Sequence, residues 1–555
     1  MSASDKKKLR KEQVSAQLTE KQKKANAEAK KLRAMSVTFV VIMLVVALTT
    51  VAVLAVRGVN NSGVIDRNTI AAVVGDQELN SIQMNYYLVD EVRNTYTQWQ
   101  NAYGSSVALY ASLMGINVNS PIDEQMYDIE NAQTWADFFL DSAMEKARSD
   151  YALYNKAMAD NFKLPEDDQK NLDSISATLT LYALYSGYND ADKYLSAIYG
   201  YGADVDSYVA YSKIAMTASA YYNQHRDALT YDETKIDEYE KDKFDNYSSF
   251  DYASYYVSAS SYLKGTKGED GTTSYTDEDR VAALAEADKI AKELATNTDV
   301  ESLDKAIAAL EINKDNKNAA TTKNTDVMYS NVPTDTLKAW LADAARVEGE
   351  IGIVVNETVT TDADGKETKT TNGYYVVVFQ GRDDNLRMLA NVRHLLVSFE
   401  GGTLNSDGTR TYSDTEKATA KAKAEDLLKQ WQEGEKADEA AFIELVKKHS
   451  TDEGSASEGG LYEGIHARSS YVENFKNWAI DPERKANDAG VIESEYGYHV
   501  MYYVGDGDIT YRDYMITEDI RAEDMEKWHE EILKTVKVTE KDTHRLKLDL
   551  VMSSL

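Results

Sequence analysis

A histidine at the centre of an apolar strand is the feature of this sequence that most plainly suggests chemistry. The segment ESEYGYHVMYYVG (493–505) carries apolar and aromatic residues at both odd and even positions, which predicts a strand buried on both faces, with His499 in its middle. A similar segment, TTNGYYVVVFQGR (370–382), has Tyr375 at the matching position. A lone histidine in such a strand is most often a hydrogen-bonded core residue. Whether His499 has a functional role therefore depends on the residues that accompany it.

Composition excludes several kinds of chemistry. The chain of 555 residues has no cysteine, which excludes disulfides, thiolate zinc sites, thiol nucleophiles and cysteine-linked lipid anchors. The histidines outside the repeated strands lack metal-like spacing (His225, His529, His544) or are interpreted as solvated (His449, His466). We therefore expect neither a metal nor a cofactor.

The charge is divided unevenly along the chain. Residues 1–33 hold eleven Lys/Arg and four Asp/Glu, a balance of +7, whereas the whole chain is −32, so residues 34–555 carry −39. A body this acidic repels nucleic acid, and we expect no nucleic-acid partner.

An uncharged run of 22 residues, 35–56, follows the basic segment. At ~1.5 Å per residue it spans roughly 33 Å, enough for a bilayer core. The basic flank before it predicts a single-pass signal anchor over 34–57, with the N-terminus in the cytoplasm and residues 58–555 outside. A cleaved signal peptide and a buried helix of a soluble domain are the rival interpretations.

The elements beyond the anchor suggest a helical body interrupted by other domains. Residues 58–68 read as a polar linker, followed by a strand, a Gly75-Asp76 turn and a helix capped by Asn80 or Ser81. Apolar spacings of three and four predict helices near 81–113, 122–162, 165–187 and 190–229. The tail 511–555 reads as a helix and a short strand, and we expect it to complete the 58–245 domain.

An internal repeat fills the region between 246 and 510. FDYASYYVS (250–258) parallels LANVRHLLVS (389–398), and helices capped at Thr276 and Ser413 follow each. Each copy closes with one of the two strands described above. The repeat predicts two α+β domains, 246–386 and 387–510, each a small antiparallel sheet with flanking helices.

The second copy resembles the parvulin family of peptidyl-prolyl cis-trans isomerases. The matching pieces occur in family order: RHLLV (393–397), FIELVKKHSTDEGSASEGGLYEG (442–464), YVENF (471–475) and EYGYHVMYY (495–503). With the anchor and helical region, the chain more loosely resembles the PrsA and SurA class of extracytoplasmic foldases, which implies a mainly helical, SurA-like chaperone domain at 58–245.

The resemblance implies a role for each matching residue. His394 and His499 would be paired core histidines on neighbouring strands, and Asp452 would lie beside the substrate carbonyl. Phe475 would form a wall of the proline pocket. The remaining substrate-binding candidates are Tyr471, where the family usually has Met, Tyr496 at the rim, and Leu461 after a Gly-Gly turn one residue longer than usual, with Tyr462 as its neighbour.

Each of these residues also has a plain structural interpretation. The two histidines could be bonded core residues, Asp452 could cap its loop, and Phe475 could be ordinary core. The first copy has Ser254 and Tyr375 where the second has the two histidines, and it lacks the Ser-x-Asp loop and Gly-Gly turn. We therefore predict a degenerate parvulin-like first copy without isomerase activity.

Three functional hypotheses follow. The first is a membrane-anchored isomerase and foldase that acts on X–Pro bonds of unfolded exported proteins. The second is a non-catalytic chaperone for the same partners, and the third is an anchored adaptor in envelope assembly.

Overall fold

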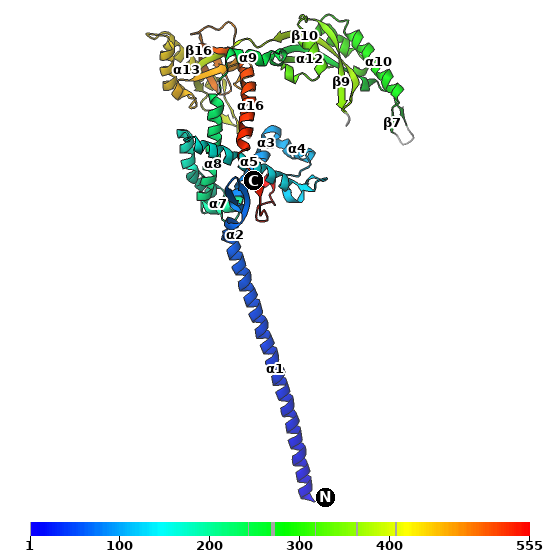
Figure 1. Ribbon diagram of the computed structural model, residues 1–555, viewed down its shortest axis with the longest axis vertical. Helices are drawn as coiled ribbons and strands as arrows, with labels where there is room; N and C mark the ends of the chain where they lie inside the picture. The colour runs from blue at the N-terminus through cyan, green and yellow to red at the C-terminus, as the bar shows by residue number, and fades with distance from the viewer. Residues whose placement is uncertain (1, 242, 268–271, 317, 362–364, 406–407) are drawn as a thin grey trace. The chain divides into compact units, whose positions relative to one another are not determined.

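The computed structural model describes residues 2–241, 243–267, 272–316, 318–361, 365–405 and 408–555. The chain divides into two compact units (Figure 1). The discontinuous unit comprises residues 1–229 and 524–555, and the inserted unit comprises residues 230–523. The mixed helix and sheet content confirms the α+β class expected from the sequence.

The discontinuous unit begins with one long helix, α1 (Ala3–Asn61). By length and composition, its segment Thr38–Asn61 could cross a membrane: an 18-residue stretch of it has a mean hydropathy of 3.0, and none of that stretch is buried. The expected polar linker at 58–68 is wrong, because α1 runs to Asn61 and α2 (Val64–Asn68) follows. Gly63, with φ of 69°, makes the break between them, and an ideal Cβ there would lie 2.3 Å from the Cα of Gly202.

The rest of this unit is a helical body around a small sheet. The sheet has the order β17-β1-β2, from β1 (Ile70–Val74), β2 (Gln77–Asn80) and the C-terminal β17 (Val538–Glu540). The helices are α3 (Ser81–Tyr103), α4 (Val107–Leu113), α5 (Trp135–Ala159), α6 (Glu166–Tyr185), α7 (Ala191–Tyr199), α8 (Val205–Ala228) and the end of α16 (Tyr511–Leu533). The antiparallel pairing of β17 with β1 joins residues 72–74 to residues 538–540, near the C-terminal end of the chain.

Two local predictions in this unit need correction. Strand β2 lies between the Gly75 turn and the helix, and Asn80 caps α3 in a capping box with Gln83. Residues 122–134 are not helical: they hold a 3-10 turn and the short strands β3 (Met126–Asp128) and β4 (Gln133–Thr134). Thr134 forms the capping box that starts α5 at Trp135, so the apolar spacing before it does not continue the helix.

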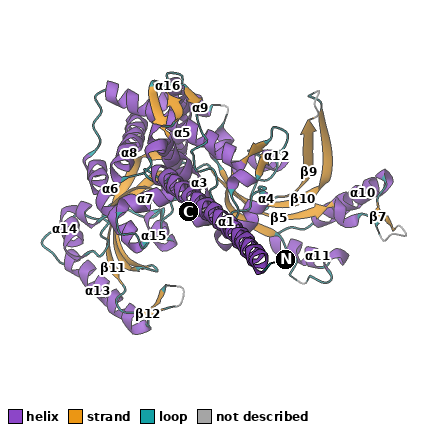
Figure 2. Cartoon of the chain, turned by 90° about the horizontal axis from the view of Figure 1, so that it is seen from below, coloured by secondary structure: helices purple, strands orange, loops and turns teal. Residues whose placement is uncertain are grey.

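The inserted unit contains two four-stranded antiparallel sheets with one topology. The first copy has the order β8-β5-β10-β9, from β5 (Ser249–Ser258), β8 (Thr322–Met328), β9 (Ile351–Thr361) and β10 (Glu367–Asp383). The second has the order β14-β11-β16-β15, from β11 (Met388–Ser398), β14 (Leu461–Ile465), β15 (Ala489–Glu493) and β16 (Gly497–Thr510). The central pair is β5 and β10 in the first sheet and β11 and β16 in the second. Figure 2 shows β5, β9 and β10 of the first sheet and β11 of the second.

Helices flank each sheet. The first copy has α10 (Asp277–Leu294), α11 (Val300–Ala308) and α12 (Asp335–Ala342), with α9 (Glu233–Glu240) before it. The second has α13 (Asp414–Gln432), α14 (Glu439–His449) and α15 (Glu473–Ala479), with the first part of α16 after it. The two-residue strands β6 (Thr266–Lys267), β7 (Thr273–Ser274), β12 (Thr403–Leu404) and β13 (Arg410–Thr411) pair in small hairpins before α10 and α13.

The strand registers align the copies residue by residue. Gly373 lies opposite Ser258 in the first sheet, and Gly497 lies opposite Ser398 in the second. Both glycines have φ near +150°, and an ideal Cβ would lie 2.3 Å and 2.2 Å, respectively, from the neighbouring strand's carbonyl oxygen. This close approach of backbones explains a glycine at this point in both copies.

Replacing Gly497 with alanine is expected to loosen the second sheet. Gly505 is the matched control, because it lies on the same strand with φ of 149° but has nothing within 4 Å of an ideal Cβ. Both changes carry backbone strain of about 1–3 kcal/mol, and only Gly497→Ala adds a collision with Val397. Amide hydrogen exchange in β11 should therefore quicken at least tenfold more in Gly497→Ala than in Gly505→Ala. Equal exchange in the two variants would contradict this account.

Candidate functional site

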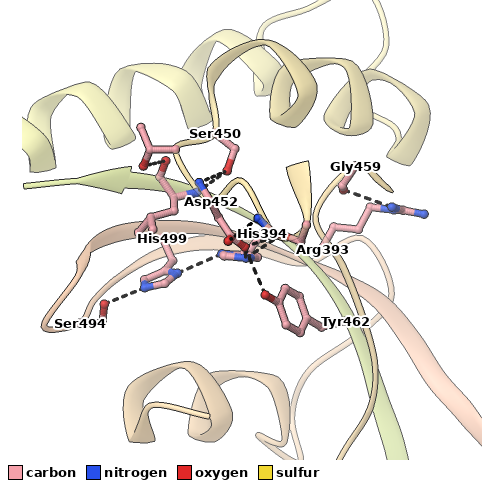
Figure 3. Close-up of polar contacts among 12 residues, drawn as sticks. Arg393, His394, Ser450, Asp452, Gly459, Tyr462, Ser494 and His499 are labelled. Carbon is pink, nitrogen blue, oxygen red and sulfur yellow. Dashed lines mark hydrogen bonds and ion pairs between the residues drawn. The ribbon is translucent and has the colours of Figure 1, made fainter. Parts of the chain in front are cut away.

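The two repeat strands of the second sheet bring His394 and His499 together. In the register of β11 and β16, His394 lies opposite Met501 and Leu396 lies opposite His499, so the histidines are diagonal neighbours on one face. Their Nδ1 atoms are 3.0 Å apart, and the two residues are only 4% and 5% exposed (Figure 3). The structure therefore brings the two histidines together as a buried pair, as expected from the sequence.

The loop after α14 brings Asp452 to the same place. The Ser450 hydroxyl accepts hydrogen bonds from the amides of Leu396 and Asp452, and the Thr451 amide donates to the Leu396 carbonyl. The loop is thus fastened along β11, and Asp452 Oδ2 lies 2.9 Å from His394 Nε2. Its Oδ1 also accepts from the Gly454 amide at 3.2 Å, so Asp452 both caps its loop and contacts the histidine.

Hydroxyl groups complete this buried network. Ser455 and Tyr462 both donate to Asp452 Oδ2, and Ser494 Oγ lies 2.7 Å from His499 Nε2 (Figure 3). An ionised carboxylate only accepts, so His394 donates from Nε2 and its Nδ1 must accept from His499. His499 Nε2 then accepts from Ser494. One proton arrangement with both imidazoles neutral satisfies every ring nitrogen.

The pKa shifts agree with this arrangement. Burial and, to a smaller extent, the neighbouring His394 lower the pKa of His499 to about 4, although the charge of Asp452 acts in the opposite direction. Burial also lowers the pKa of His394, against the opposing effect of its hydrogen bond to Asp452. Burial raises the pKa of Asp452, but the hydrogen bonds from Ser455, His394 and Tyr462 outweigh it and leave the pKa below its usual value.

Two glycines after the loop let the chain pass close to β11. Gly459 and Gly460 both have φ of 69°, and an ideal Cβ on Gly460 would lie 2.1 Å from the His394 carbonyl oxygen. The His394 amide donates to the Gly460 carbonyl at 2.9 Å. Arg393 fastens the same turn, since it donates to the carbonyls of Glu458 and Gly459 and pairs with Glu439 of α14.

A pocket of about 360 Å³ opens beside the histidines. Phe475 of α15 forms its buried wall, with its ring 5.2 Å from the His394 ring and 5.7 Å from the His499 ring. Tyr471 and Tyr496 line the pocket at its more exposed side, being 36% and 59% exposed. The other lining residues are Leu396, Asp452, Tyr462, Ser470 and Val472. The pocket is apolar and aromatic, with one carboxylate.

Leu461 is the sequence candidate that does not line this pocket. Along β14, Leu461 lies opposite Arg393 and Tyr462 opposite Val392, so adjacent residues face opposite sides of the sheet. The Tyr462 side chain donates to Asp452 and lines the pocket, whereas Leu461, the candidate named from the sequence, does not. Ser455 and Ser494, which sequence reasoning missed, lie in irregular segments where periodicity gives no signal.

His466 also differs from its interpretation as a solvated residue. It is half-buried, and its ring stacks on Tyr511 at 4.2 Å with an angle of 14° between the planes. Across the described ranges of the chain, no group of three or more His, Cys, Asp or Glu is arranged to hold a metal ion.

The first copy has different chemistry at the matching positions. Ser254 and Tyr256 take the places of His394 and Leu396, and Tyr375 takes the place of His499. The rings of Tyr256 and Tyr375 are 4.9 Å apart, and Asn324 donates to the Ser254 hydroxyl at 3.3 Å. Leu337 replaces the aromatic ring of Phe475 on the corresponding helix.

Comparison with known proteins identifies one domain. Residues 394–505, about a fifth of the chain, match the family described as Rotamase: PPIC-type PPIASE domain. No curated protein sequence gives a significant match.

Solved structures with similarity to this chain include three PrsA proteins. PrsA of Bacillus anthracis, a peptidylprolyl isomerase, is 20% identical over 27% of this chain and 59% of its own, with a TM-score of 0.18. The foldase protein PrsA of Streptococcus pneumoniae is 15% identical over 26% and 47%, with a TM-score of 0.16. PrsA of Bacillus subtilis is 13% identical over 72% and 88%, with a TM-score of 0.23. The chain thus spans about three fifths of the first and about half of the second.

Acid is expected to destabilise the second copy because its histidines are buried without charge. An unfolded histidine titrates near 6.5, whereas His499 in the fold titrates near 4, so the unfolded state binds more protons between these values. The unfolding free energy should therefore fall as the pH drops from 6.5 to 4, by about 3 kcal/mol from His499 alone. Urea unfolding at pH 7 and pH 5, with imidazole NMR titrations, measures the effect.

His499→Asn is the control for this pH dependence. It removes the titrating group, so its unfolding free energy should change less between pH 7 and pH 5 than that of the parent protein. A His499 resonance that titrates near pH 6.5 in the folded protein would contradict the assignment.

Proposed function

We propose that this chain, whose residues 394–505 form a PPIC-type rotamase domain, is a membrane-anchored extracytoplasmic peptidyl-prolyl isomerase and foldase for exported proteins. One observation carries the proposal: the neutral pair His394–His499, closed by Asp452, forms one side of a pocket whose wall is Phe475. The proposed partners are unfolded chains with X–Pro bonds.

The reaction needs geometry rather than a nucleophile. An X–Pro bond rotates over a barrier of about 20 kcal/mol, and no covalent bond breaks. In the twisted transition state the amide loses resonance, so a pocket that favours the twisted form over the planar forms lowers the barrier. In our proposal the proline ring lies against Phe475, and Tyr471 and Tyr496 contact the flanking residues.

The polar network contributes shape and electrostatics. His394, Ser455 and Tyr462 donate to Asp452 Oδ2 and hold its carboxylate in one orientation, and His499 in turn holds His394. The Asp452 side chain remains 22% exposed, and the residue lines the pocket, where we propose that it faces the substrate carbonyl. The histidines act as positioning residues in this mechanism, since each ring nitrogen is already engaged within the protein.

Variants of this network test the catalytic proposal. His394→Ala and Asp452→Ala should each lower kcat/KM for a proline peptide at least tenfold in a protease-coupled assay, because the pocket loses its fixed carboxylate. Ser254→Ala is the matched control, since Ser254 is the first-copy counterpart of His394 and should leave the rate unchanged. A parent protein that only matches the uncatalysed rate would overturn the isomerase proposal.

A non-catalytic chaperone is the second candidate, and exposed apolar side chains of the discontinuous unit favour it. Leu109 and Leu113 on α4 are 66% and 79% exposed, and Ile129 in the β3–β4 hairpin is 82% exposed. Gln125, just before β3, contacts the loop after α4, because it accepts from the Asn117 amide at 2.6 Å and donates to its carbonyl. Such a surface suits loose contact with unfolded chains.

Polar replacements on this surface test the chaperone component. Leu113→Ser combined with Ile129→Ser should weaken the suppression of aggregation of reduced, denatured lysozyme several-fold without altering isomerase activity. Leu404→Ser is the control, because Leu404 is similarly exposed, at 63%, but lies in the β12–β13 hairpin of the second copy. An equal effect of the control would mean that general surface hydrophobicity is responsible.

The proposed location rests on α1. Its apolar segment follows a lysine-rich stretch, which supports a single-pass anchor with the N-terminus in the cytoplasm and residues 58–555 outside.

A further inference from the structure

The first copy has a groove beside the central strands of its sheet. It measures about 530 Å³ and lies between the end of β5, the start of α10 and the β9–β10 hairpin. Two of its lining residues, Tyr256 and Asn372, occupy the positions of Leu396 and Tyr496 in the other copy's pocket. The groove therefore lies beside the place where the isomerase site would be.

The loss of one aromatic ring opens this groove. In the second copy, Phe399 follows β11, is 7% exposed and packs 5.0 Å from the Tyr412 ring. Its counterpart in the first copy is Ala259, one residue after Ser258, and Ala259 lines the groove.

A cation beside the groove has no counterpart of the carboxylate with which its equivalent pairs in the second copy. In the second copy Lys417, four residues after the helix cap, pairs with Glu493 at 3.4 Å. The matching residues in the first copy are Arg280, four after the cap Thr276, and Val355, which lies opposite Tyr374 as Glu493 lies opposite Tyr498. Arg280 is exposed and, within the described part of the chain, has no ion pair.

A longer hairpin supplies the other wall. Seventeen residues, 356–372, separate Val355 from Gly373, whereas three residues, 494–496, separate Glu493 from Gly497. The extra residues extend β9 and β10 beyond the rest of the sheet (Figure 2), and 369–372 line the groove. Lys369 adds a second cation, held only loosely by Glu357 at 3.8 Å.

We propose that this groove binds an extended, acidic segment of an unfolded polypeptide. Arg280 and Lys369 would pair with its carboxylates, and no Asp or Glu is among the described residues that line the groove. The described lining thus carries two cations and no carboxylate, although the chain as a whole has a net charge of −32. A guanidinium binds a carboxylate through two parallel hydrogen bonds, which fixes its orientation.

The remaining lining suits an extended backbone with alternating side chains. Ser260, Thr370, Thr371 and Asn372 offer hydrogen-bonding groups, while Leu263 and Val281 offer apolar contact, Val281 being 69% exposed. A peptide that alternates acidic and apolar residues would place one set on the cations and the other on these side chains. Proline is not required, because the histidines and Asp452 have no counterparts here.

Peptide binding to the full chain in detergent micelles tests the proposal. The probe is a fluorescein-labelled, proline-free peptide of alternating leucine and glutamate, and its reference has glutamine in place of glutamate. At low salt the glutamate peptide should bind at least tenfold more tightly by fluorescence anisotropy. Arg280→Glu should remove this difference, whereas Lys289→Glu, an equal charge change on an exposed α10 residue outside the groove, should preserve it.

A second variant tests the site by shape. Ala259→Phe introduces the ring found in the second copy and should weaken the binding of the glutamate peptide at least tenfold. Equal binding of the two peptides to the parent protein, an unchanged affinity in Arg280→Glu or Ala259→Phe, or an equal loss in Lys289→Glu would overturn the proposal. Isomerase activity towards a proline peptide should be the same in the parent and Arg280→Glu, so this result is separate from the fate of the isomerase proposal.

Discussion

The second copy depends on the burial of two imidazoles that cannot both be charged. Each neutral ring has one donor and one acceptor, so the carboxylate of Asp452 at one end of the row dictates the direction of every hydrogen bond up to Ser494. These hydrogen-bonded side chains are held in place by the loop after α14, the Gly-Gly turn and the adjacent strands, and the two histidines are buried among them. A change at either end would leave a buried nitrogen without a partner.

The comparison between the copies separates backbone constraints from chemistry. Both sheets keep the same strand order and the same glycine pressed against a neighbouring carbonyl, and in both an arginine, Arg346 or Arg484, lies over a tryptophan of the last helix. These features belong to the fold, since they survive where the histidines do not. Ser254 and Tyr375 mark the positions at which the two copies differ in chemistry while the backbone stays the same.

Sequence predicted the parts of the structure that follow periodicity and local capping. Local sequence was enough to predict the repeat and the helix caps Thr276 and Ser413. The proximity of His394, Asp452 and His499 was predictable because motifs in family order imply one sheet. The site residue on β14 was not predictable in this way. The sequence suggested Leu461 but the structure has Tyr462, because a shift of one residue in the preceding turn reverses which side chain faces the site. Contacts made by irregular loops, such as those of Ser455 and Ser494, depend on tertiary structure that no local pattern encodes.

The pairing of β1 with β17 has a consequence for the order of assembly. Ala72 lies opposite Glu540, so the small sheet of the discontinuous unit joins strands that are more than 450 residues apart in the sequence. The N-terminal helices emerge first but cannot close their core until the last residues arrive, whereas each sheet of the inserted unit has all its strands within one continuous stretch. A protein proposed to assist folding would thus itself be synthesised with an unfinished, partly apolar helical body.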